Sequence, residues 1–432
     1  MTTRSIGARI PRNEDPRLLQ GLGCFVDDIN PPGVLHAASL RSPHAHARIV
    51  RIDATAARRI PGVRLVTTAA ELGPLNQPSP LLIPHPTLTH GRTQHPLATD
   101  EVRYVGEVVA FVVAESRYIA EDAAALIDVQ YEPLAVVTDL ATALSPGAPR
   151  VHDDVPDNRA ARFRQTVGDA DGRLARAPHV LRERLTIERS CGSPLEARGV
   201  VADWDARRRV LRVWDSTQAP LPIKNGLAGL FGLPEFNVEV VAPDVGGGFG
   251  TKIMLFFPEE ILVPHAAITL GRPVKWTEDR REHLMCLNHA REAECDVEIA
   301  CTRDGTILGL RGHAYVDVGA YMRTNGAVGA RNVAQFMSGP YRIPNIDIDV
   351  ALQLTNKTPV GTYRGPGRFE TDFFRERLLD MVAQDLGLDR VEFRRRIQGC
   401  ALCPARKLPH RAALCAPDGA ARPAGGMGCH AG

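Results

Sequence analysis

The feature that most constrains this chain is a glycine-rich stretch at 243–252, which reads Pro-Asp-Val-Gly-Gly-Gly-Phe-Gly-Thr-Lys. Glycine loses more backbone freedom on folding than any other residue, so such a cluster is costly unless the backbone must bend tightly or approach something closely. The strand-like run at 236–241 just before it, Phe-Asn-Val-Glu-Val-Val, would bring the loop to the end of a sheet. The stretch therefore predicts either a tight turn without a ligand or one wall of a binding site.

The spacing of the glycines argues against a nucleotide phosphate as the ligand. A dinucleotide-binding loop needs G-x-G-x-x-G and a P-loop needs G-x-x-x-x-G-K-[ST], and neither pattern occurs in the stretch. A nucleotide-binding module is therefore a disfavoured function for this chain.

The overall composition argues against several other classes of protein. The 432 residues carry a net charge of +2, which offers little electrostatic attraction to nucleic acid or to an anionic membrane. No apolar run approaches the roughly 18 residues of a membrane-spanning helix, and residues 1–9 lack the apolar core of a signal peptide. We expect a cytoplasmic protein that acts on a small molecule, with no nucleic-acid or membrane partner.

Several motifs accompany the glycine-rich stretch in a fixed order. Trp-Asp-Ser-Thr-Gln-Ala-Pro stands upstream at 214–220, and Thr-Tyr-Arg-Gly-Pro-Gly-Arg-Phe-Glu stands downstream at 362–370. Over nearly all of residues 4–396 the chain resembles the large, molybdopterin-binding subunit of the xanthine dehydrogenase and aldehyde oxidase family. The further stretches that carry the resemblance are 11–19, 25–29, 41–47, 102–107, 120–124, 271–282, 317–321, 376–380, 386–389 and 394–396.

The resemblance and the alternation of short strands and helices together predict an α+β fold. Residues 1–140 are expected to form an α/β-hammerhead domain with an N-terminal arm. Residues 141–180, rich in Ala, Pro, Asp and Arg, are expected to be a linker. Residues 181–397 are expected to form the first, mixed α/β molybdopterin-binding domain, which is incomplete without a second half.

The resemblance stops at residue 397, and the remaining segment differs in composition. Residues 398–432 contain no Val, Ile, Phe, Tyr or Trp, so they cannot build a core and are predicted to be disordered. Arginine far outnumbers lysine in the chain, which suggests GC-rich coding DNA, and an out-of-frame reading of such DNA yields many Ala, Arg, Pro, Gly, Cys and His codons. We hypothesise a frameshift near codon 397 that truncated the gene.

Neither of two candidate metal motifs makes a convincing metal site. Cys400 and Cys403 form a C-x-x-C pair, but a zinc site would need a second pair. His44 and His46 would face the same side of a strand, but no third ligand stands near them in the sequence. We expect a structural role for the two histidines.

The resemblance implies roles for residues around a molybdenum centre. Gln218 matches a glutamine that donates to an oxo ligand, which an amide can do without adding charge; the alternative is a capping or turn glutamine. Gly247, Gly248 and Gly250 match the backbone that lies against the metal's oxo face, where N–H groups favour anionic atoms. Phe249 would line the substrate pocket, or else pin the loop from the core. The resemblance implies that Gln218 and Phe249 lie around the molybdenum and that no protein side chain binds the metal directly.

Three further positions bear on the substrate and the cofactor. Arg364 matches the arginine of the family's substrate loop, where a guanidinium can stabilise charge developing on a heterocycle or carbonyl; the alternative is a structural salt bridge. Ile253 stands where the xanthine-type enzymes carry a substrate-binding glutamate, which argues against a purine substrate. Gly-Pro-Gly at 365–367 lacks the cysteine of the carbon monoxide enzymes. Arg396 matches a family arginine near the molybdenum domain and is taken as a cofactor contact.

The resemblance also implies cofactors and partners that this chain does not encode. The cofactor would be molybdenum-molybdopterin, in the cytosine dinucleotide form usual in bacteria. No iron–sulfur pattern and no flavin fingerprint occurs in the sequence, so electrons would pass to an iron–sulfur small subunit and an FAD-binding medium subunit in a hetero-oligomer. The family's general base is a glutamate in a G-x-G-E motif, and this chain has no such motif.

Two functions remain open at the level of the sequence. The chain is either the N-terminal half of a molybdenum hydroxylase or dehydrogenase that oxidises an aldehyde or an aromatic N-heterocycle with water as the oxygen source, or a truncated, non-catalytic remnant. The first is active only if a second polypeptide supplies the base and most of the pterin contacts.

Overall fold

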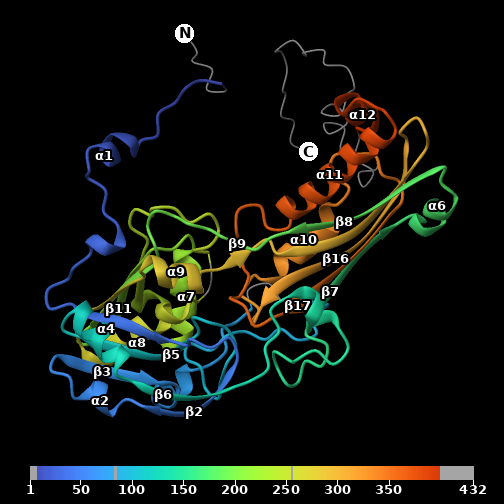
Figure 1. Cartoon of the computed structure of the whole chain (residues 1–432). Helices are drawn as coiled ribbons and strands as arrows, with labels where there is room; N and C mark the ends of the chain where they lie inside the picture. Colours follow the sequence, from blue (N-terminus) through green and yellow to red (C-terminus); the bar gives the residue numbers. More distant parts are fainter. Residues whose placement is uncertain (1–6, 82–84, 254–255, 399–432) are drawn as a thin grey trace, which may run out of the picture.

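The computed structural model of the protein describes residues 7–81, 85–253 and 256–398. Within these residues the chain forms a seven-stranded and a five-stranded β-sheet, together with small sheets of three and two strands. In Figure 1 the seven-stranded sheet and its helices lie at the lower left and the five-stranded sheet lies at the right. The mixture of sheets and helices confirms the predicted α+β class.

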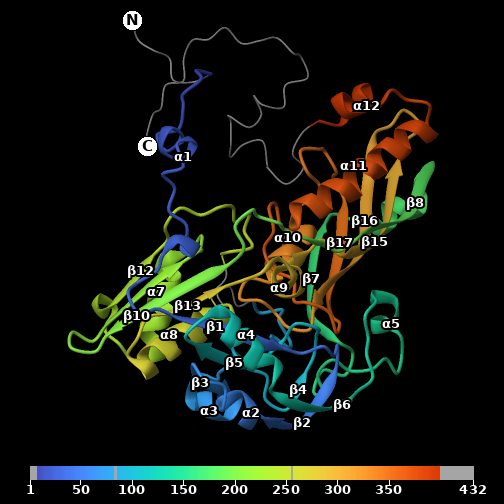
Figure 2. The ribbon, with the colours of Figure 1, turned by 60° about the vertical axis from the view of Figure 1, so that its left-hand side comes forward.

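The seven-stranded sheet combines two distant parts of the sequence. Its strands, in spatial order, are β12 (Val238–Val241), β11 (Val210–Asp215), β10 (Gly199–Asp205), β13 (Val274–Thr277), β1 (Leu35–Arg41), β5 (Val108–Ala114) and β3 (Val63–Thr68). β1 pairs in parallel with β13, with Leu35 opposite Val274. Strands from the predicted hammerhead domain and from the predicted molybdopterin-binding domain therefore share one sheet, as Figure 2 shows for β1, β5, β10 and β13.

Local signals explain why helices form beside this sheet. The Ser116 side chain accepts the Ile119 N–H and so caps α4 (Arg117–Ala125). α8 (Pro258–Leu270) begins with Pro258, and the Phe257 N–H donates to the Glu260 carboxylate at 2.8 Å. The remaining elements around the sheet are α1 (Asp15–Leu19), η1 (Val26–Asp28), α2 (Thr55–Arg58), α3 (Ala69–Leu72), η2 (Gly73–Leu75), α7 (Pro220–Phe231), η3 (Glu235–Asn237) and α9 (Arg280–Cys286). The two small sheets consist of β4 (Glu101–Val102), β2 (Ala47–Asp53) and β6 (Asp128–Pro133), and of β14 (His289–Ala290) and β9 (Ser190–Cys191).

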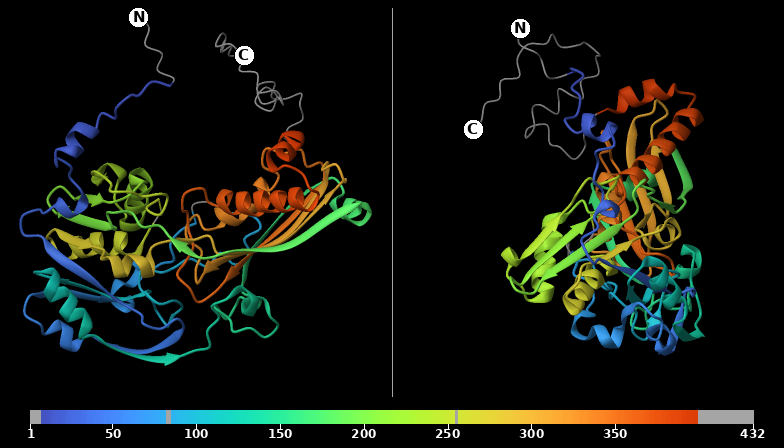
Figure 3. Two further views of the ribbon diagram at one scale, coloured as in Figure 1. Left: turned by 45° about the horizontal axis from the view of Figure 1, so that its top comes forward. Right: turned by 90° about the vertical axis from the view of Figure 1, so that its left-hand side faces the viewer.

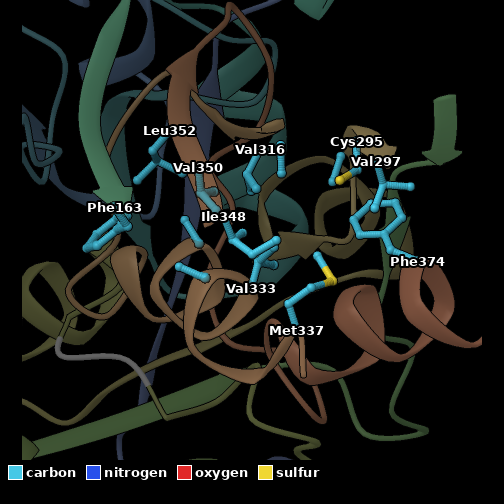
Figure 4. Packing of buried hydrophobic residues seen from close by; sticks show 14 of the residues in the cluster. Phe163, Cys295, Val297, Val316, Val333, Met337, Ile348, Val350, Leu352 and Phe374 are labelled. Carbon is cyan, nitrogen blue, oxygen red and sulfur yellow. The ribbon is translucent and has the colours of Figure 1, made fainter. Parts of the chain in front are cut away.

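The five-stranded sheet carries the largest buried core. Its strands, in spatial order, are β7 (Arg159–Val167), β17 (Ile346–Leu354), β16 (Ile307–Gly319), β15 (Ala293–Cys301) and β8 (His179–Ile187). α10 (Ala327–Phe336) and α11 (Arg368–Asp385) cover one face, as Figures 1 and 3 show, and α12 (Arg390–Ile397) follows α11. Figure 4 shows the packing between them, in which Phe374 of α11 lies near Val297 of β15 and Met337 lies near Val333.

The opposite face of the five-stranded sheet carries ordered charges. One row crosses the sheet in register: Arg184 stands opposite Asp296, which stands opposite His313, then Asp349 and Arg164. The next row contains Arg182, Glu298, Arg311 and Asp347. Opposite charges directly across neighbouring strands stabilise a sheet. We call these residues the outer charged face.

The structure corrects the expectation that residues 141–180 form a linker. That interval contains α5 (Leu140–Leu144), the edge strand β7 and α6 (Ala170–Arg176), and it reaches the start of β8. Strand β7 buries Ala161 and Phe163 while Arg162 and Arg164 point outward. The arginines serve the outer charged face. Residues 161–164 alternate between apolar and polar as in a half-buried strand, but the run is short and lies within a segment whose composition resembles a linker.

Two other expectations concern the ends and surroundings of the fold. The predicted disordered tail at 398–432, with Cys400 and Cys403, lies outside the described residues beyond Gln398. Among the described helices, none is long and apolar enough to cross a membrane.

Candidate functional site

The glycine-rich stretch connects β12 to α8 with an unusual backbone. Gly247 and Gly250 have φ values of +103° and +89°, in the region that favours glycine. Phe249 also has a positive φ, +54°, which is uncommon for a residue with a side chain. A non-glycine residue in this region is held there by its surroundings and often marks a functional site.

Close packing against three other segments explains the glycines. A Cβ at Gly246 would lie 2.4 Å from the Cβ of Glu196, and a Cβ at Gly250 would lie 2.6 Å from the Thr362 side chain. A Cβ at Gly248 would lie 2.4 Å from the Gln218 side chain. Real Cβ atoms do not approach so closely, so each glycine permits a contact within the chain itself. The stretch is therefore more than a plain turn, because it brings together segments that are distant in sequence.

The side chain of Gln218 is oriented by the glycine-rich stretch. The Gly250 N–H donates to Gln218 Oε1 at 2.8 Å, and the Gln218 N–H donates to the Lys252 carbonyl at 2.9 Å. Because Oε1 faces a donor, the amide NH₂ group is turned away from the loop. The side chain is exposed, and within the described ranges its NH₂ group has no hydrogen-bond partner. Gln218 thus presents an uncharged donor at the surface of the loop.

Arg364 meets the same loop from the other side. Its N–H donates to the Phe249 carbonyl at 2.8 Å, so the substrate-loop motif and the glycine-rich stretch are joined directly. The Phe249 side chain is 43% exposed, which does not fit the alternative of a core phenylalanine. The Arg364 side chain is exposed, and among residues 7–81, 85–253 and 256–398 it has no salt-bridge partner. The structure brings Gln218, Phe249, Gly250 and Arg364 to one place.

Arg396 lies elsewhere. It belongs to α12, its guanidinium pairs with Glu392 at 3.3 Å, and it reaches the Asp304 carbonyl in the turn between β15 and β16. Gln218 follows β11, in the other large sheet. The structure therefore does not join Arg396 to the cluster around Gln218.

A buried polar network that sequence reasoning missed supports the loop. Lys252, which is 2% exposed, donates to the Glu196 carboxylate at 3.1 Å and to Ser216 Oγ at 2.7 Å. The Gly246 N–H donates to the same Glu196 carboxylate at 2.8 Å. Burial lowers the pKa of Lys252, although Glu196 partly offsets this effect. No sequence pattern marks Glu196, because its partners Ser216, Gly246 and Lys252 stand 20, 50 and 56 residues away in the sequence.

The N-terminal arm holds the start of the glycine-rich stretch. Arg17 donates to both oxygens of Asp244 at 2.5 and 2.6 Å, and the Cys24 N–H donates to the same carboxylate at 2.8 Å. The Arg17 hydrogen bonds lower the pKa of Asp244 to about 2. A bidentate pair of this kind fixes direction as well as distance, so the arm is anchored beside the loop.

A cluster of buried charges joins the ends of β1, β10 and β13 to α8 and α9, and we call it the junction cluster. Arg198 donates to Glu278 at 2.6 Å and to Glu259 at 3.0 Å, and Arg41 donates to Glu259 and Glu282 at 2.7 and 2.9 Å. The Arg198 guanidinium also lies over the rings of Phe257 and Trp276. Burial opposes ionisation of Glu278, but Arg198 and His283 outweigh it and bring the pKa to about 2.

Among the described residues, His44 and His46 do not belong to a group of side chains that could bind a metal ion. His46 Nδ1 lies 2.8 Å from the Ala135 carbonyl, and the His44 ring packs against Tyr131. In the part of the chain that the structure describes, no group of three or more His, Cys, Asp or Glu side chains could hold a metal ion.

Comparison with known proteins assigns the fold and the site to a family. The model of the molybdopterin cofactor-binding domain matches residues 151–397, and that of the a/b hammerhead domain of aldehyde oxidase and xanthine dehydrogenase matches residues 20–135. The chain therefore belongs to the xanthine dehydrogenase and aldehyde oxidase family of molybdopterin-binding proteins, as its motifs indicated.

Individual relatives show how much of a family member this chain represents. The 6-hydroxypseudooxynicotine dehydrogenase complex subunit gamma of Paenarthrobacter nicotinovorans is 40% identical over 90% of this chain and 49% of its own length. The crystal structure of quinoline 2-oxidoreductase from Pseudomonas putida 86 is 38% identical, with a TM-score of 0.87 over 94% of this chain and 51% of its own. The chain thus spans about half the length of these relatives.

One relative is itself of similar extent. The nicotinate dehydrogenase large molybdopterin subunit of Eubacterium barkeri is 27% identical, and the match covers 87% of this chain and 85% of that subunit. A chain of about this extent therefore occurs as a named subunit of a family enzyme.

Proposed function

We propose that this chain supplies one half of the molybdopterin-binding unit of a molybdenum hydroxylase or dehydrogenase. The substrate class is an aromatic N-heterocycle or an aldehyde, and water is the oxygen source. The observation that carries the proposal is the meeting of Gln218, Phe249, Gly250 and Arg364 on one exposed surface. The similar structure named for quinoline is 38% identical, whereas two aldehyde oxidoreductases are 26% and 25% identical, which favours a nitrogen heterocycle over an aldehyde.

The residues present fit a molybdenum cofactor with anionic oxo ligands. The Gln218 NH₂ group is an uncharged donor that is turned away from its own loop. At Gly248 a Cβ would fill the space beside that side chain. Gln218 and the backbone of Gly247 and Gly248 would hold the oxo face. When bound, the cofactor supplies the two-electron oxidation of the substrate.

The chain's own side chains would act on the substrate. Phe249, with its ring exposed, provides an apolar wall against which a flat heterocycle can pack. Arg364, with its guanidinium exposed, would stabilise negative charge that develops on the ring nitrogen or carbonyl. Ile253 beside the loop is uncharged and 37% exposed, so it offers no carboxylate to a purine.

The rest of the enzyme would correspond to the half of the relatives that this sequence does not match. That region would carry the general base and the remaining pterin contacts. The cofactor would be the molybdopterin cytosine dinucleotide. An iron–sulfur small subunit and an FAD-binding medium subunit would complete a hetero-oligomer and take the electrons.

A second candidate function is a non-catalytic remnant that binds no molybdopterin. The observation that favours it is the absence of a G-x-G-E motif from the sequence, because loss of a general base alone typically slows a reaction 10²–10⁴-fold. The two candidates differ in one measurable property, the binding of molybdenum.

Metal analysis of the purified protein tests the proposal. The chain would be expressed alone and together with a polypeptide homologous to the second half of its relatives, and molybdenum and pterin would be measured per chain. We expect stoichiometric molybdenum in the complex, lost in Gln218→Glu, which sets a negative charge against the oxo groups. Gln130→Glu makes the same charge change on the exposed strand β6 and should leave the metal content unchanged. Molybdenum-free protein under both conditions would favour the remnant.

A further inference from the structure

A buried arginine outside every motif of the sequence contacts the loop that carries Arg364. Arg291 lies between β14 and β15, and its side chain is 7% exposed. Its backbone has a φ of +82°, which is uncommon for a residue with a side chain. Among the described non-glycine residues with a positive φ, two contact the 363–365 loop. Arg291 contacts it through its guanidinium, and Phe249 contacts it through its carbonyl, which accepts the Arg364 N–H.

The guanidinium of Arg291 donates hydrogen bonds to three consecutive backbone carbonyls of this loop. It donates to the Arg364 carbonyl at 2.5 Å, to the Tyr363 carbonyl at 3.2 Å and to the Gly365 carbonyl at 3.4 Å. The carboxylate of Glu370, also buried, lies 3.3 Å away and balances the charge. One side chain therefore satisfies the backbone on both sides of Arg364.

One aromatic ring from this loop and one from the first turn of α11 contact the guanidinium. Its central carbon lies 4.7 Å from the Tyr363 ring centroid and 4.4 Å from that of Phe369. Both distances are within the range of a cation–π contact. The planar guanidinium of arginine can donate several hydrogen bonds along its edges while its faces contact aromatic rings. The ammonium group of lysine cannot do both.

We infer that Arg291 is a positioning residue that sets the conformation of the 363–365 loop, and through it the placement of Arg364 beside Phe249. A catalytic consequence of this role rests on the proposed function, but the effect of Arg291 on the loop conformation does not. The loop touches the glycine-rich stretch through the Arg364 N–H and the Phe249 carbonyl. Release of the three carbonyls would loosen that bond as well, because the same short loop carries both.

Hydrogen–deuterium exchange on the full chain tests the inference without any cofactor. We expect Arg291→Lys to speed exchange of the peptide that spans 361–369 by about tenfold, since hydrogen bonds to a charged group are lost. Arg368→Lys is the matched control. Among the described residues the Arg368 side chain stacks on the Phe336 ring and makes no hydrogen bond or ion pair, so its substitution should leave the exchange of that peptide unchanged. Peptides from β15 and β16 report whether the fold is intact.

A second variant keeps the test decisive if Arg291→Lys unfolds the chain. Tyr363→Leu removes one stacking ring and leaves all three carbonyls in place, so it should speed exchange of the same peptide by a smaller factor. Wild-type exchange in both variants, or equal acceleration in Arg291→Lys and Arg368→Lys, would overturn the inference.

Kinetics on the loaded complex separate the two proposals. If Arg291 acts through Arg364, the losses in kcat/KM of Arg291→Lys and Arg364→Ala are not additive in the double variant. Additive losses would contradict the coupling. An inactive, metal-free wild type that still shows the exchange difference would refute the proposed function and leave the positioning role of Arg291 standing.

Discussion

The junction cluster and the outer charged face contain the same residue types but differ in their structural role. In the junction cluster Arg198, Glu259 and Glu278 are almost fully buried, and they come from three separate segments. On the outer charged face Arg184 and Asp296 are 61% and 42% exposed and stand directly opposite each other on adjacent strands. The outer pairs lie on a sheet that backbone hydrogen bonds already define. The junction cluster joins the ends of the paired strands β10 and β13 to α8 through buried side chains.

The difference shows where electrostatics has structural consequences. Exposed ion pairs contribute little, because water and salt screen them. Buried charges must be paired, since an unpaired charge in a protein interior is very costly. Arg198 stands two residues after Glu196, which holds Lys252 and Gly246. The junction cluster therefore fixes the base of the glycine-rich stretch, and the outer charged face is remote from it in sequence and in its sheet.

The largest expected effect comes from removal of the central arginine of the junction cluster. Arg198→Met would leave Glu259 and Glu278 buried with their strongest partner gone, at a cost of about 3–5 kcal/mol in the free energy of unfolding. Urea unfolding followed by tryptophan fluorescence measures this, and Trp276 lies 5.1 Å from the guanidinium. Arg184→Met is the matched variant on the outer charged face. If Arg198→Met lowered the free energy of unfolding by less than Arg184→Met, the contrast between buried and exposed ion pairs would be wrong.

Acid should weaken the junction cluster more than the outer charged face. The folded-state pKa of Glu278 is about 2 and its ordinary value is 4.5, so its contribution is present above pH 4.5 and is lost as the pH falls toward 2. By linkage the shift corresponds to about 3 kcal/mol. Melting temperatures from pH 7 to pH 3 should therefore converge for wild type and Glu278→Gln.

The matched variant for the acid experiment is Asp296→Asn. Arg184 lowers the pKa of Asp296, so the sign of the pH dependence is the same, but solvent screening makes its amplitude smaller. Equal amplitudes for the two variants would remove the distinction between the buried and the exposed cluster.

A smaller effect is expected from one pair of the outer charged face. Arg184→Ala removes two hydrogen bonds to Asp296, at 2.6 and 2.7 Å, but both side chains remain hydrated. We expect a loss below about 1 kcal/mol in thermal or urea unfolding. A loss as large as that of Arg198→Met would show that the outer charged face acts as a cooperative network.

The smallest effect is the response to salt. At 1 M NaCl the Debye length is about 3 Å, so the difference between wild type and Arg184→Ala should fall within the error of the measurement. The cost of Arg198→Met should persist, because ions do not reach a buried pair. Persistence of the Arg184→Ala difference at high salt would mean that packing of the side chain, rather than charge, is its source.

Much of the local structure could be predicted because its causes are local. Helix α8 has local signals at both ends, with a proline at its start and a glycine after its end. The hairpin of β15 and β16 turns at Gly305, whose φ of +90° favours glycine. Strand β7 escaped prediction because its exposed arginines resembled a polar linker, although their partners stand on β17.

The residues of the candidate site likewise include some that the sequence identified and some that it did not. The motifs around Gln218, Phe249 and Arg364 were identified from the sequence, and the structure brings these residues together. Their catalytic roles stay predictions, as does the role of Arg396, which the structure sets apart. Glu196 and Arg291 could not be found beforehand, because each acts on segments far from it in the chain.

The sequence by itself determined the family, the glycine-rich stretch and the residue types that line the site, since motifs and backbone preferences are properties of short segments. Only the tertiary structure decided that β1 and β13 share a sheet across the predicted domains, and that the glycines make room for Glu196, Gln218 and Thr362. The physical reason is that close packing and the pairing of buried charges depend on distances between segments, which no local pattern records.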